Sequence, residues 1–305
     1  MTDESIISFP LPDDSHVLTF DLERANLRGR ITRLGKILDD VLTPHHFPEP
    51  IEKLLVETMT LSVLLSSMLK YDGIFILQAQ GDGIVSRLVA DITSSGEMRG
   101  TAGFDTDMLA DLLSKNPHPS AAQLLGKGYI AFTVDQGEFS ERYQGIVELK
   151  DNLLDSIHLY FSQSEQIGTA IKMAVQKGDN GKWQTGAIMI QYTPDHSNIP
   201  QDIKPIAENW NRAQILLETC TDTELLDFKL RDEILLYRLF HEEVVRVYKP
   251  QPITKGCRCT PEKLKNVLAL LSSEDLDHAA HDGNVIMTCE FCNKDFGFFI
   301  DELKT

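Results

Sequence analysis

The chain has 305 residues, of which 42% are hydrophobic and 25% charged, as in ordinary soluble globular proteins. Its net charge of -17 opposes binding to nucleic acid and to anionic membranes. The most apolar window, 61–69, is about half the roughly 20 residues that a membrane span needs, and the acidic residues 1–15 do not resemble a signal peptide. We therefore expect a cytoplasmic protein, in which clustered cysteines are metal ligands or redox centres rather than structural disulfides.

The first two-thirds of the chain mixes strand and helix patterns. Four segments carry strand patterns on both sides of turn residues and predict hairpins. They are 16–34 around 23–26, 73–92 around 81–83, 128–149 near 136–137, and 169–192 across 179–181. Helical spacing predicts a largely buried helix within 48–70 and a second helix at 152–161. The fold class is therefore α+β, with antiparallel sheet and packed helices in an N-terminal domain at 1–195.

A boundary is predicted after residue 194, where "TPDHSNIPQDIKP" carries three prolines. Helical spacing follows at 206–220 and 222–248, which predicts a helical linker over 196–250. In the second helix an apolar stripe of Leu226, Leu230, Ile234, Leu235 and Leu239 leaves Asp232, Glu233, Glu242 and Glu243 on other faces.

The remaining piece, 251–305, is too small for a self-sufficient core and is expected to need a staple such as a metal. Thr260 is predicted to cap a helix that starts at Pro261. Its apolar stripe comprises Leu264, Val267, Leu268 and Leu271. Residues 281–300 predict two strands joined by a cysteine turn.

Four of the five cysteines lie in this piece, as the pairs Cys257/Cys259 and Cys289/Cys292. Four thiolates suit a closed tetrahedral structural site, for which Zn²⁺ is the metal we expect. The other interpretations are an iron–sulfur cluster, three cysteines with His278 or His281, and four inert buried cysteines. Lys255, Arg258 and Lys294 flank the ligands and either offset the negative charge of the site or are simply solvated.

The spacing of the first pair differs from that of the second. On an extended strand Cys257 and Cys259 share a face, with Cα atoms about 6.5–7 Å apart, which is the upper limit for a disulfide. They then bind a metal easily but join each other only after the backbone bends. Oxidation and loss of the metal are expected to unfold the module, since metal binding in such modules is folding energy.

The chain resembles the heat-shock protein 33 family of redox-regulated chaperones. The resemblance rests on "CRC" at 257–259 and "CEFC" at 289–292, extended by "LLGKGYIAFTVD" at 124–135, "YQGIVEL" at 143–149 and "YFSQSEQIGTAIKMAV" at 160–175. Asn293 departs from the glycine common in such turns, which is tolerable because Asn accepts a left-handed conformation. Cys220 lies outside the motif and is expected to be a half-buried helix residue.

The resemblance implies a function. The reduced protein holds one zinc ion through Cys257, Cys259, Cys289 and Cys292 and is inactive. Oxidants form the disulfides Cys257–Cys259 and Cys289–Cys292 and expel zinc, and the linker at 196–250 loses its packing. The exposed apolar surface binds unfolding client proteins without ATP, and dimerisation accompanies activation. The protein is then a holdase and not an enzyme, with no nucleic-acid or membrane partner.

Two rival functions are a zinc-ribbon protein that binds nucleic acid and a thiol oxidoreductase. The net charge of -17 counts against the first, and four closing ligands without a thioredoxin-like context count against the second. "SEQ" at 164–166 has no histidine at a local spacing and predicts turn and strand-start residues, not a catalytic pair. "GDGIVSRL" lacks the Lys-Ser/Thr of a P-loop, which leaves no sign of ATP binding.

Overall fold

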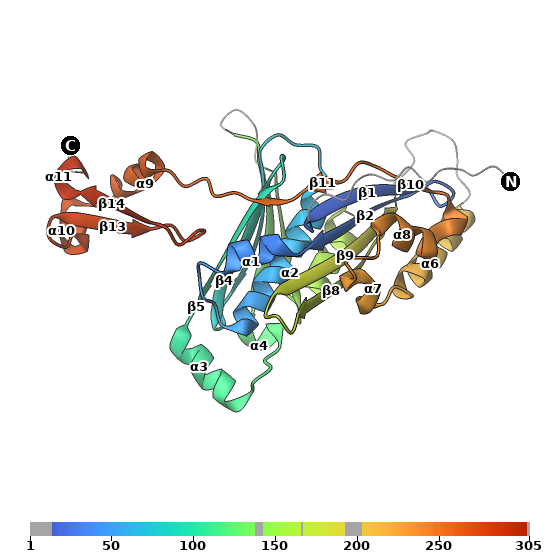
Figure 1. Cartoon of the computed structure of the whole chain (residues 1–305), viewed down its shortest axis with the longest axis horizontal. Helices are drawn as coiled ribbons and strands as arrows, with labels where there is room; N and C mark the ends of the chain where they lie inside the picture. Colours follow the sequence, from blue (N-terminus) through green and yellow to red (C-terminus); the bar gives the residue numbers. More distant parts are fainter. Residues whose placement is uncertain (1–13, 138–142, 166, 193–202, 304–305) are drawn as a thin grey trace.

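Two six-stranded sheets face each other across a buried helix in a computed structural model of the chain (Figure 1). The structure describes residues 14–137, 143–165, 167–192 and 203–303. The loop predicted near 136–137 runs partly outside these residues, and most of the predicted boundary after 194 lies outside them as well. Mixed helices and antiparallel strands confirm the α+β class.

The first sheet has the order β10-β1-β2-β9-β8, with β11 paired to β1. The second has the order β12-β5-β4-β3-β6-β7. The strands of the first sheet are β1 (His16–Leu22), β2 (Leu27–Leu34), β8 (Thr169–Lys177), β9 (Trp183–Tyr192), β10 (Val245–Val247) and β11 (Gln251–Pro252). Those of the second are β3 (Ile74–Gly81), β4 (Val85–Thr93), β5 (Glu97–Phe104), β6 (Gly128–Asp135), β7 (Tyr143–Glu148) and β12 (Thr254–Lys255).

All four predicted strand pairs form as antiparallel neighbours, namely β1–β2, β3–β4, β6–β7 and β8–β9. The turn residues adopt the conformations that such short connections need. Asn26 has φ 52° between β1 and β2, and Gly181 has φ 76° between β8 and β9. Local alternation and turn chemistry therefore sufficed to predict these pairings.

The predicted helix within 48–70 is α2 (Glu49–Ser66), which lies between the two sheets. It is buried on nearly every side, so its polar side chains need hydrogen-bond partners inside the protein. Thr58 and Thr60 donate to the carbonyls of Leu54 and Val56, at 2.7 and 2.8 Å. The other helices of this part are α1 (Lys36–Leu42), α3 (Thr106–Lys115), α4 (Ala121–Leu125), α5 (Leu153–Tyr160) and a π-helix, Phe161–Glu165. The predicted helix at 152–161 is α5, while Ser164 lies in the π-helix instead of a turn.

The linker helices cover the face of the first sheet that points away from α2. They are α6 (Ile203–Glu218), α7 (Asp222–Leu226) and α8 (Asp232–Phe240), followed by a 3₁₀ turn (His241–Glu243). Their buried leucines join Leu18, Phe20 and Ile31 of the sheet in a second hydrophobic core. The linker is thus packed in this state.

The single helix predicted over 222–248 is wrong. The chain breaks between α7 and α8, and its end forms β10, which pairs with β1. Ile234 is 46% exposed, although it belongs to the predicted apolar stripe, whereas Asp232 and Glu233 are buried. The reason is tertiary, because Asp232 lies 2.5 Å from His16 and 3.1 Å from Arg33 in the sheet.

The C-terminal module lies at one end of the molecule, and its hairpin points toward the second sheet (Figure 1). It contains α9 (Pro261–Leu268), α10 (Ser273–Ala279), β13 (Asn284–Thr288), β14 (Asp295–Phe299) and α11 (Ile300–Leu303). Thr260 accepts a hydrogen bond from the Lys263 amide and caps α9, as predicted. The hydrophobic core of the module is small. Among the described residues it has five buried side chains, Leu268, Leu276, Val285, Phe298 and Leu303.

The predicted stripe of α9 is only partly buried. Leu268 is 5% exposed and Leu264 packs against the core of the module, but Val267 and Leu271 are 49% and 43% exposed. The helix ends at Leu268, so the residues beyond it no longer follow helical spacing. A module with so few buried side chains depends on another source of stability.

The segment that leads to the cysteines is joined to both sheets. β10 and β11 pair with β1 of the first sheet, and β12 pairs in parallel with β5 of the second. Between them, Ile253 is 4% exposed and its amide donates to the Ser15 carbonyl. The domain boundaries at 195/196 and 250/251 stay predictions, and residues 251–255 contribute strands to the two sheets.

Candidate metal centre

Cys257 and Cys259 lie directly beyond β12. The Gly256 amide still donates to the Met98 carbonyl at 3.0 Å, after which the regular pairing stops. The expectation that the two cysteines share one face of an extended strand is therefore wrong, since the strand ends at Lys255. In this irregular segment their sulfurs approach to 3.3 Å.

Cys289 and Cys292 lie on the turn between β13 and β14, as predicted. The amides of Cys292 and Asn293 both donate to the Cys289 carbonyl, at 3.3 and 2.8 Å. Asn293 adopts φ 54°, which confirms that it takes the left-handed position in place of glycine. This turn directs both sulfurs toward the first cysteine pair.

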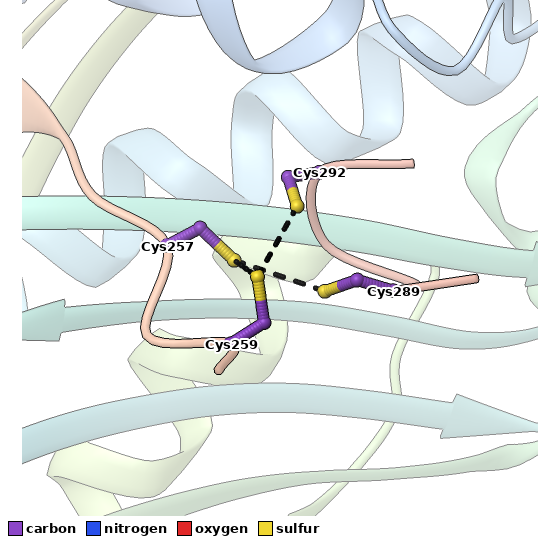
Figure 2. A group of neighbouring side chains, drawn as sticks. All are labelled: Cys257, Cys259, Cys289 and Cys292. Carbon is purple, nitrogen blue, oxygen red and sulfur yellow. Dashed lines mark hydrogen bonds between the residues drawn. The ribbon is translucent and has the colours of Figure 1, made fainter. Parts of the chain in front are cut away.

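All four sulfurs converge from two separate segments (Figure 2). Cys257 lies 3.7 Å from Cys289, Cys259 lies 3.5 Å from Cys292, and all four sulfurs lie within 4.8 Å of one another. Ligand bonds of about 2.3 Å in a tetrahedron separate sulfurs by about 3.8 Å, whereas a disulfide requires about 2.05 Å. The cluster therefore fits a metal ion held by four free thiols.

Histidine does not belong to this cluster. His281 is 96% exposed and faces Asp282, and the Nδ1 atom of His278 bonds the Glu274 carbonyl at 2.8 Å. Among the described residues the metal-binding group consists of the four cysteines alone. The alternative with three cysteines and one histidine is thus not supported.

Crowding of the thiols makes it difficult for all four to ionise without a cation. Burial raises the pKa of Cys259, and the neighbouring thiols raise it further. Burial also raises the pKa of Cys292. At Cys257 burial acts in the same direction, but hydrogen bonds from Cys259 and the other thiols outweigh it and lower the pKa to about 7. A divalent cation at the centre would allow all four to be thiolates.

The two cysteine segments are attached to the second sheet through one carboxylate. Arg258, between Cys257 and Cys259, forms an ion pair with Asp91 of β4. Arg99 of β5 binds the other oxygen of Asp91 at 2.8 Å and lies 3.8 Å from the ring centre of Phe291, between Cys289 and Cys292. Asp91 is only 3% exposed, so this contact is largely shielded from water.

Other contacts surround this docking site. His45 donates to the Phe291 carbonyl at 3.2 Å, and burial lowers the pKa of His45, although the carbonyl opposes that shift. Asn293 donates to the Pro44 carbonyl at 2.7 Å, and Arg87 pairs with Glu290 at 2.8 Å. Glu290, Phe291 and Asn293 therefore all contact the N-terminal part of the chain.

The flanking cations have other partners than the sulfurs. Lys255 donates to the Asp40 carbonyl, Arg258 pairs with Asp91, and Lys294 lies 5.2 Å from the ring centre of Phe296. Sequence reasoning identified these three residues but missed the roles of Asp91, Arg99 and Phe291. No local signal points to them, because Asp91 and Arg258 are 167 positions apart.

Cys220 is separate from the cluster. It lies just after α6 and is 1% exposed, so it is more deeply buried than predicted and outside the helix. Burial raises the pKa of its thiol to about 11. Its environment in the second hydrophobic core matches the expected role of a small hydrophobic residue.

The fold and the site together define a class of protein, one with a two-sheet α+β body and a four-cysteine metal-binding module docked on it. A family model described as "Hsp33 protein" matches residues 15–299. The chain belongs to the Hsp33 family of chaperones.

Two relatives agree with this assignment, and a solved structure shares the fold. The 33 kDa chaperonin of Caulobacter vibrioides (strain NA1000 / CB15N) is 37% identical over 286 residues, which cover 92% of this chain and 93% of that protein. The 33 kDa chaperonin of Pseudomonas fluorescens (strain SBW25) is 34% identical over 291 residues, covering 94% and 92%. The crystal structure of a 33 kDa chaperonin from Thermotoga maritima superimposes with a TM-score of 0.77 at 21% identity, covering 95% of this chain and 96% of that one.

Among the described residues, none of the helices combines the length and the hydropathy needed to cross a lipid bilayer.

Proposed function

We propose that the protein is a redox-controlled, ATP-independent holdase that is inactive when reduced and metal-bound, and that it acts by binding unfolding clients and not as an enzyme. The observation that carries this proposal is the place of the four thiols. They lie at the contact between the C-terminal module and the second sheet, so a change in their bonding reaches both parts of the chain. Family membership supports the chaperone activity itself.

Zinc is the proposed metal, held by Cys257, Cys259, Cys289 and Cys292. Four sulfur donors with close sulfur–sulfur spacing match the donor set and size of a structural zinc site. When bound, zinc keeps the four sulfurs as thiolates and links the two cysteine segments. The small core of the module is consistent with stability supplied by a metal.

Oxidation is proposed to form the disulfides Cys257–Cys259 and Cys289–Cys292. Formation of each disulfide releases two electrons from a pair of thiolates. One hydrogen peroxide molecule takes up those electrons with two protons and becomes two water molecules. The sulfurs of Cys257 and Cys259 are already 3.3 Å apart and must approach by about 1.2 Å to reach bonding distance. Two disulfides leave no thiolate to retain the metal.

The disulfides are proposed to undock the module and then the linker. Closing Cys257–Cys259 turns the backbone that carries Arg258, which separates Arg258 from Asp91. The released segment 245–255 supplies edge strands to both sheets, and its loss uncovers them. Detachment of α8 would then expose the buried side chains of Leu235, Leu236 and Phe240 to clients.

The proposal extends to partners and location. Homodimerisation accompanies activation, because newly exposed edge strands and apolar surface favour association of two copies. The net charge of -17 argues against nucleic-acid and anionic-membrane partners. We place the protein in the cytoplasm, where thiols remain reduced until oxidants rise.

The test treats zinc-loaded protein with peroxide at mildly elevated temperature. Zinc release, disulfide pairing by peptide mass spectrometry, and aggregation of a heat-unfolding client are followed on the same samples. We expect one zinc released per chain, the two disulfides named above, and suppressed aggregation only after oxidation. Zinc release without holdase activity would refute the chaperone mechanism.

A matched control separates the redox centre from the remaining cysteine. Cys220→Ser leaves the four ligands in place, and its oxidation response should equal that of the unmodified protein. Cys289→Ser removes one ligand and should weaken zinc binding and remove the dependence on oxidation. If both variants respond alike, the cluster is not the redox sensor.

A further inference from the structure

A cavity of about 530 Å³ opens where the first and second sheets meet the end of α2. Sites for small ligands occupy about 300–1,000 Å³, so the cavity has the size of a binding site. It belongs neither to the cysteine cluster nor to the docking contact around Asp91. The proposed redox mechanism assigns it no role.

Most of the cavity wall is aromatic or aliphatic. Phe132 and Tyr160 lie with ring centres 4.5 Å apart, and Phe161 meets Tyr160 edge to face at 5.5 Å. Tyr71, Phe75, Tyr143 and Tyr192 complete the aromatic wall, and the aliphatic side chains are Leu65, Met68, Leu69, Val134 and Ile167. Such a wall favours an apolar chain or ring system over a polar metabolite.

The charges that line the cavity are all of one sign. Arg28, Arg30 and Lys70 line it, and the described lining residues include no aspartate or glutamate. This is unusual for a chain with 46 acidic and 29 basic residues. The lining therefore carries positive charge within a strongly negative protein and favours an anion.

Arg30 is the central cation, because it is 6% exposed and has no carboxylate partner among the described residues. Its Nε atom donates to the Ser67 carbonyl at 3.2 Å, next to the end of α2, and no hydrogen bond joins either Nη atom to a described residue. Burial, and then the neighbouring Arg28, lower the pKa of Arg30 to about 10, while the more distant carboxylate of Asp21 opposes that shift. A buried guanidinium with no carboxylate in direct contact is destabilising unless a ligand supplies one.

The two neighbouring cations are only weakly engaged. Arg28 lies 3.6 Å from Asp21 but is 60% exposed, so that ion pair is screened by water. Lys70 is exposed and forms no ion pair with a described residue. Both side chains can thus turn toward an anionic group at the mouth of the cavity.

We infer that this cavity binds a single-chain amphiphilic carboxylate, a fatty-acid-like anion whose carboxylate meets the Nη atoms of Arg30 and whose tail lies on the aromatic wall. The planar fork of a guanidinium matches a carboxylate in two parallel hydrogen bonds. The tail removes apolar side chains from water, which supplies most of the affinity. The site goes beyond the proposed holdase function and exists in the reduced protein.

Isothermal titration calorimetry on reduced, zinc-loaded protein tests this inference. The probe is decanoate below its micelle concentration, compared with decanol, decyltrimethylammonium and acetate. We expect saturable one-to-one binding of decanoate, with each of the other three about tenfold weaker or more. Equal binding of the three ten-carbon probes would show a general apolar surface and overturn the inference.

Variants locate the site. Arg30→Gln should weaken decanoate binding by about tenfold or more, whereas Arg246→Gln, which makes the same charge change on β10, should leave it unchanged. Leu69 lies at the mouth and is 41% exposed, so Leu69→Glu keeps the test valid if Arg30→Gln fails to fold. Leu69→Glu should abolish decanoate binding, and the neutral control Leu69→Gln should not.

Two further outcomes would overturn the inference. One is unaltered decanoate affinity in folded Arg30→Gln and Leu69→Glu. The other is binding to phosphatidylglycerol vesicles without binding of monomeric decanoate, since that would assign the cationic surface to membranes. Because every measurement uses reduced protein, a negative result leaves the proposed holdase mechanism untouched.

Discussion

Arg258 offers the sharpest test of how the cysteine module is held. Its ion pair with Asp91 is the most buried charged contact between the module and the second sheet, with side chains 20% and 3% exposed. Arg258→Met keeps most of the aliphatic stem and removes the charge. Asp91 retains Arg99, so the body of the protein should stay folded.

The expected magnitude follows from the burial of this pair. A hydrogen bond between charged groups contributes about 1.5–3 kcal/mol, and each 1.4 kcal/mol is a factor of ten. The undocked population should therefore rise by about 10- to 150-fold in Arg258→Met. Undocking uncovers the thiols, including Cys289, which is 6% exposed in the docked state.

The assay is the rate of peroxide-driven zinc release, followed in a stopped-flow instrument with a coloured zinc chelator. We expect Arg258→Met to release zinc faster than the unmodified protein, by a factor of up to about 10 to 150. Arg87→Met is the matched control, because it makes the same chemical change at an ion pair whose side chains are 40% and 65% exposed. Exposed pairs contribute less than about 1 kcal/mol, which limits its effect to about fivefold.

Two results would refute this reasoning. Equal rates for Arg258→Met and the unmodified protein would mean that docking does not limit access to the thiols. Equal acceleration by Arg258→Met and Arg87→Met would mean that burial of the Asp91 contact is irrelevant.

Three further predictions concern the linker, the metal and the fifth cysteine. Asp232→Asn removes the buried negative charge that pairs with His16 and Arg33, and it should destabilise the packing of the linker by about 3–5 kcal/mol. Hydrogen exchange of the amides in α8 should then be faster, and unchanged exchange would contradict this prediction. Chelation of zinc should unfold the β13–β14 hairpin while both large sheets persist, which the amide resonances of the two parts would report separately. Simultaneous loss of the amide resonances of the whole molecule would contradict a separate module. Cys220, whose pKa is raised to about 11, should resist alkylation at pH 8 in the folded protein, and rapid labelling of the native protein would refute this. Its contribution to the stability of the fold should decline between about pH 9 and 11, because the thiol ionises at lower pH in the unfolded chain than in the folded one.

The sequence was most informative where structure is local. Alternating residues and turn formers such as Asn26 and Gly181 predicted the hairpins, because register and turn conformation depend on neighbours in the chain. The cap at Thr260 and the left-handed Asn293 were predicted for the same reason. The four-cysteine cluster was predicted from spacing, since few other arrangements use two close thiol pairs.

The sequence failed where a distant partner overrides local preference. Helical periodicity predicted one helix over 222–248, but pairing of β10 with β1 and burial of Asp232 beside Arg33 break it into shorter pieces. Likewise the pairing of β12 with β5 covers only Thr254 and Lys255, so Cys257 and Cys259 lie beyond the strand.

By itself the sequence determined the class of fold, the four thiols and the family resemblance, all of which depend on short patterns of residue type. Only the tertiary structure decided which residues hold the module, namely Asp91, Arg99 and Phe291. It also decided which buried cation forms no ion pair with a carboxylate of the described residues, namely Arg30. The physical reason is that an ion pair or a lone buried charge depends on distance in space, and residues 167 positions apart carry no local record of their contact.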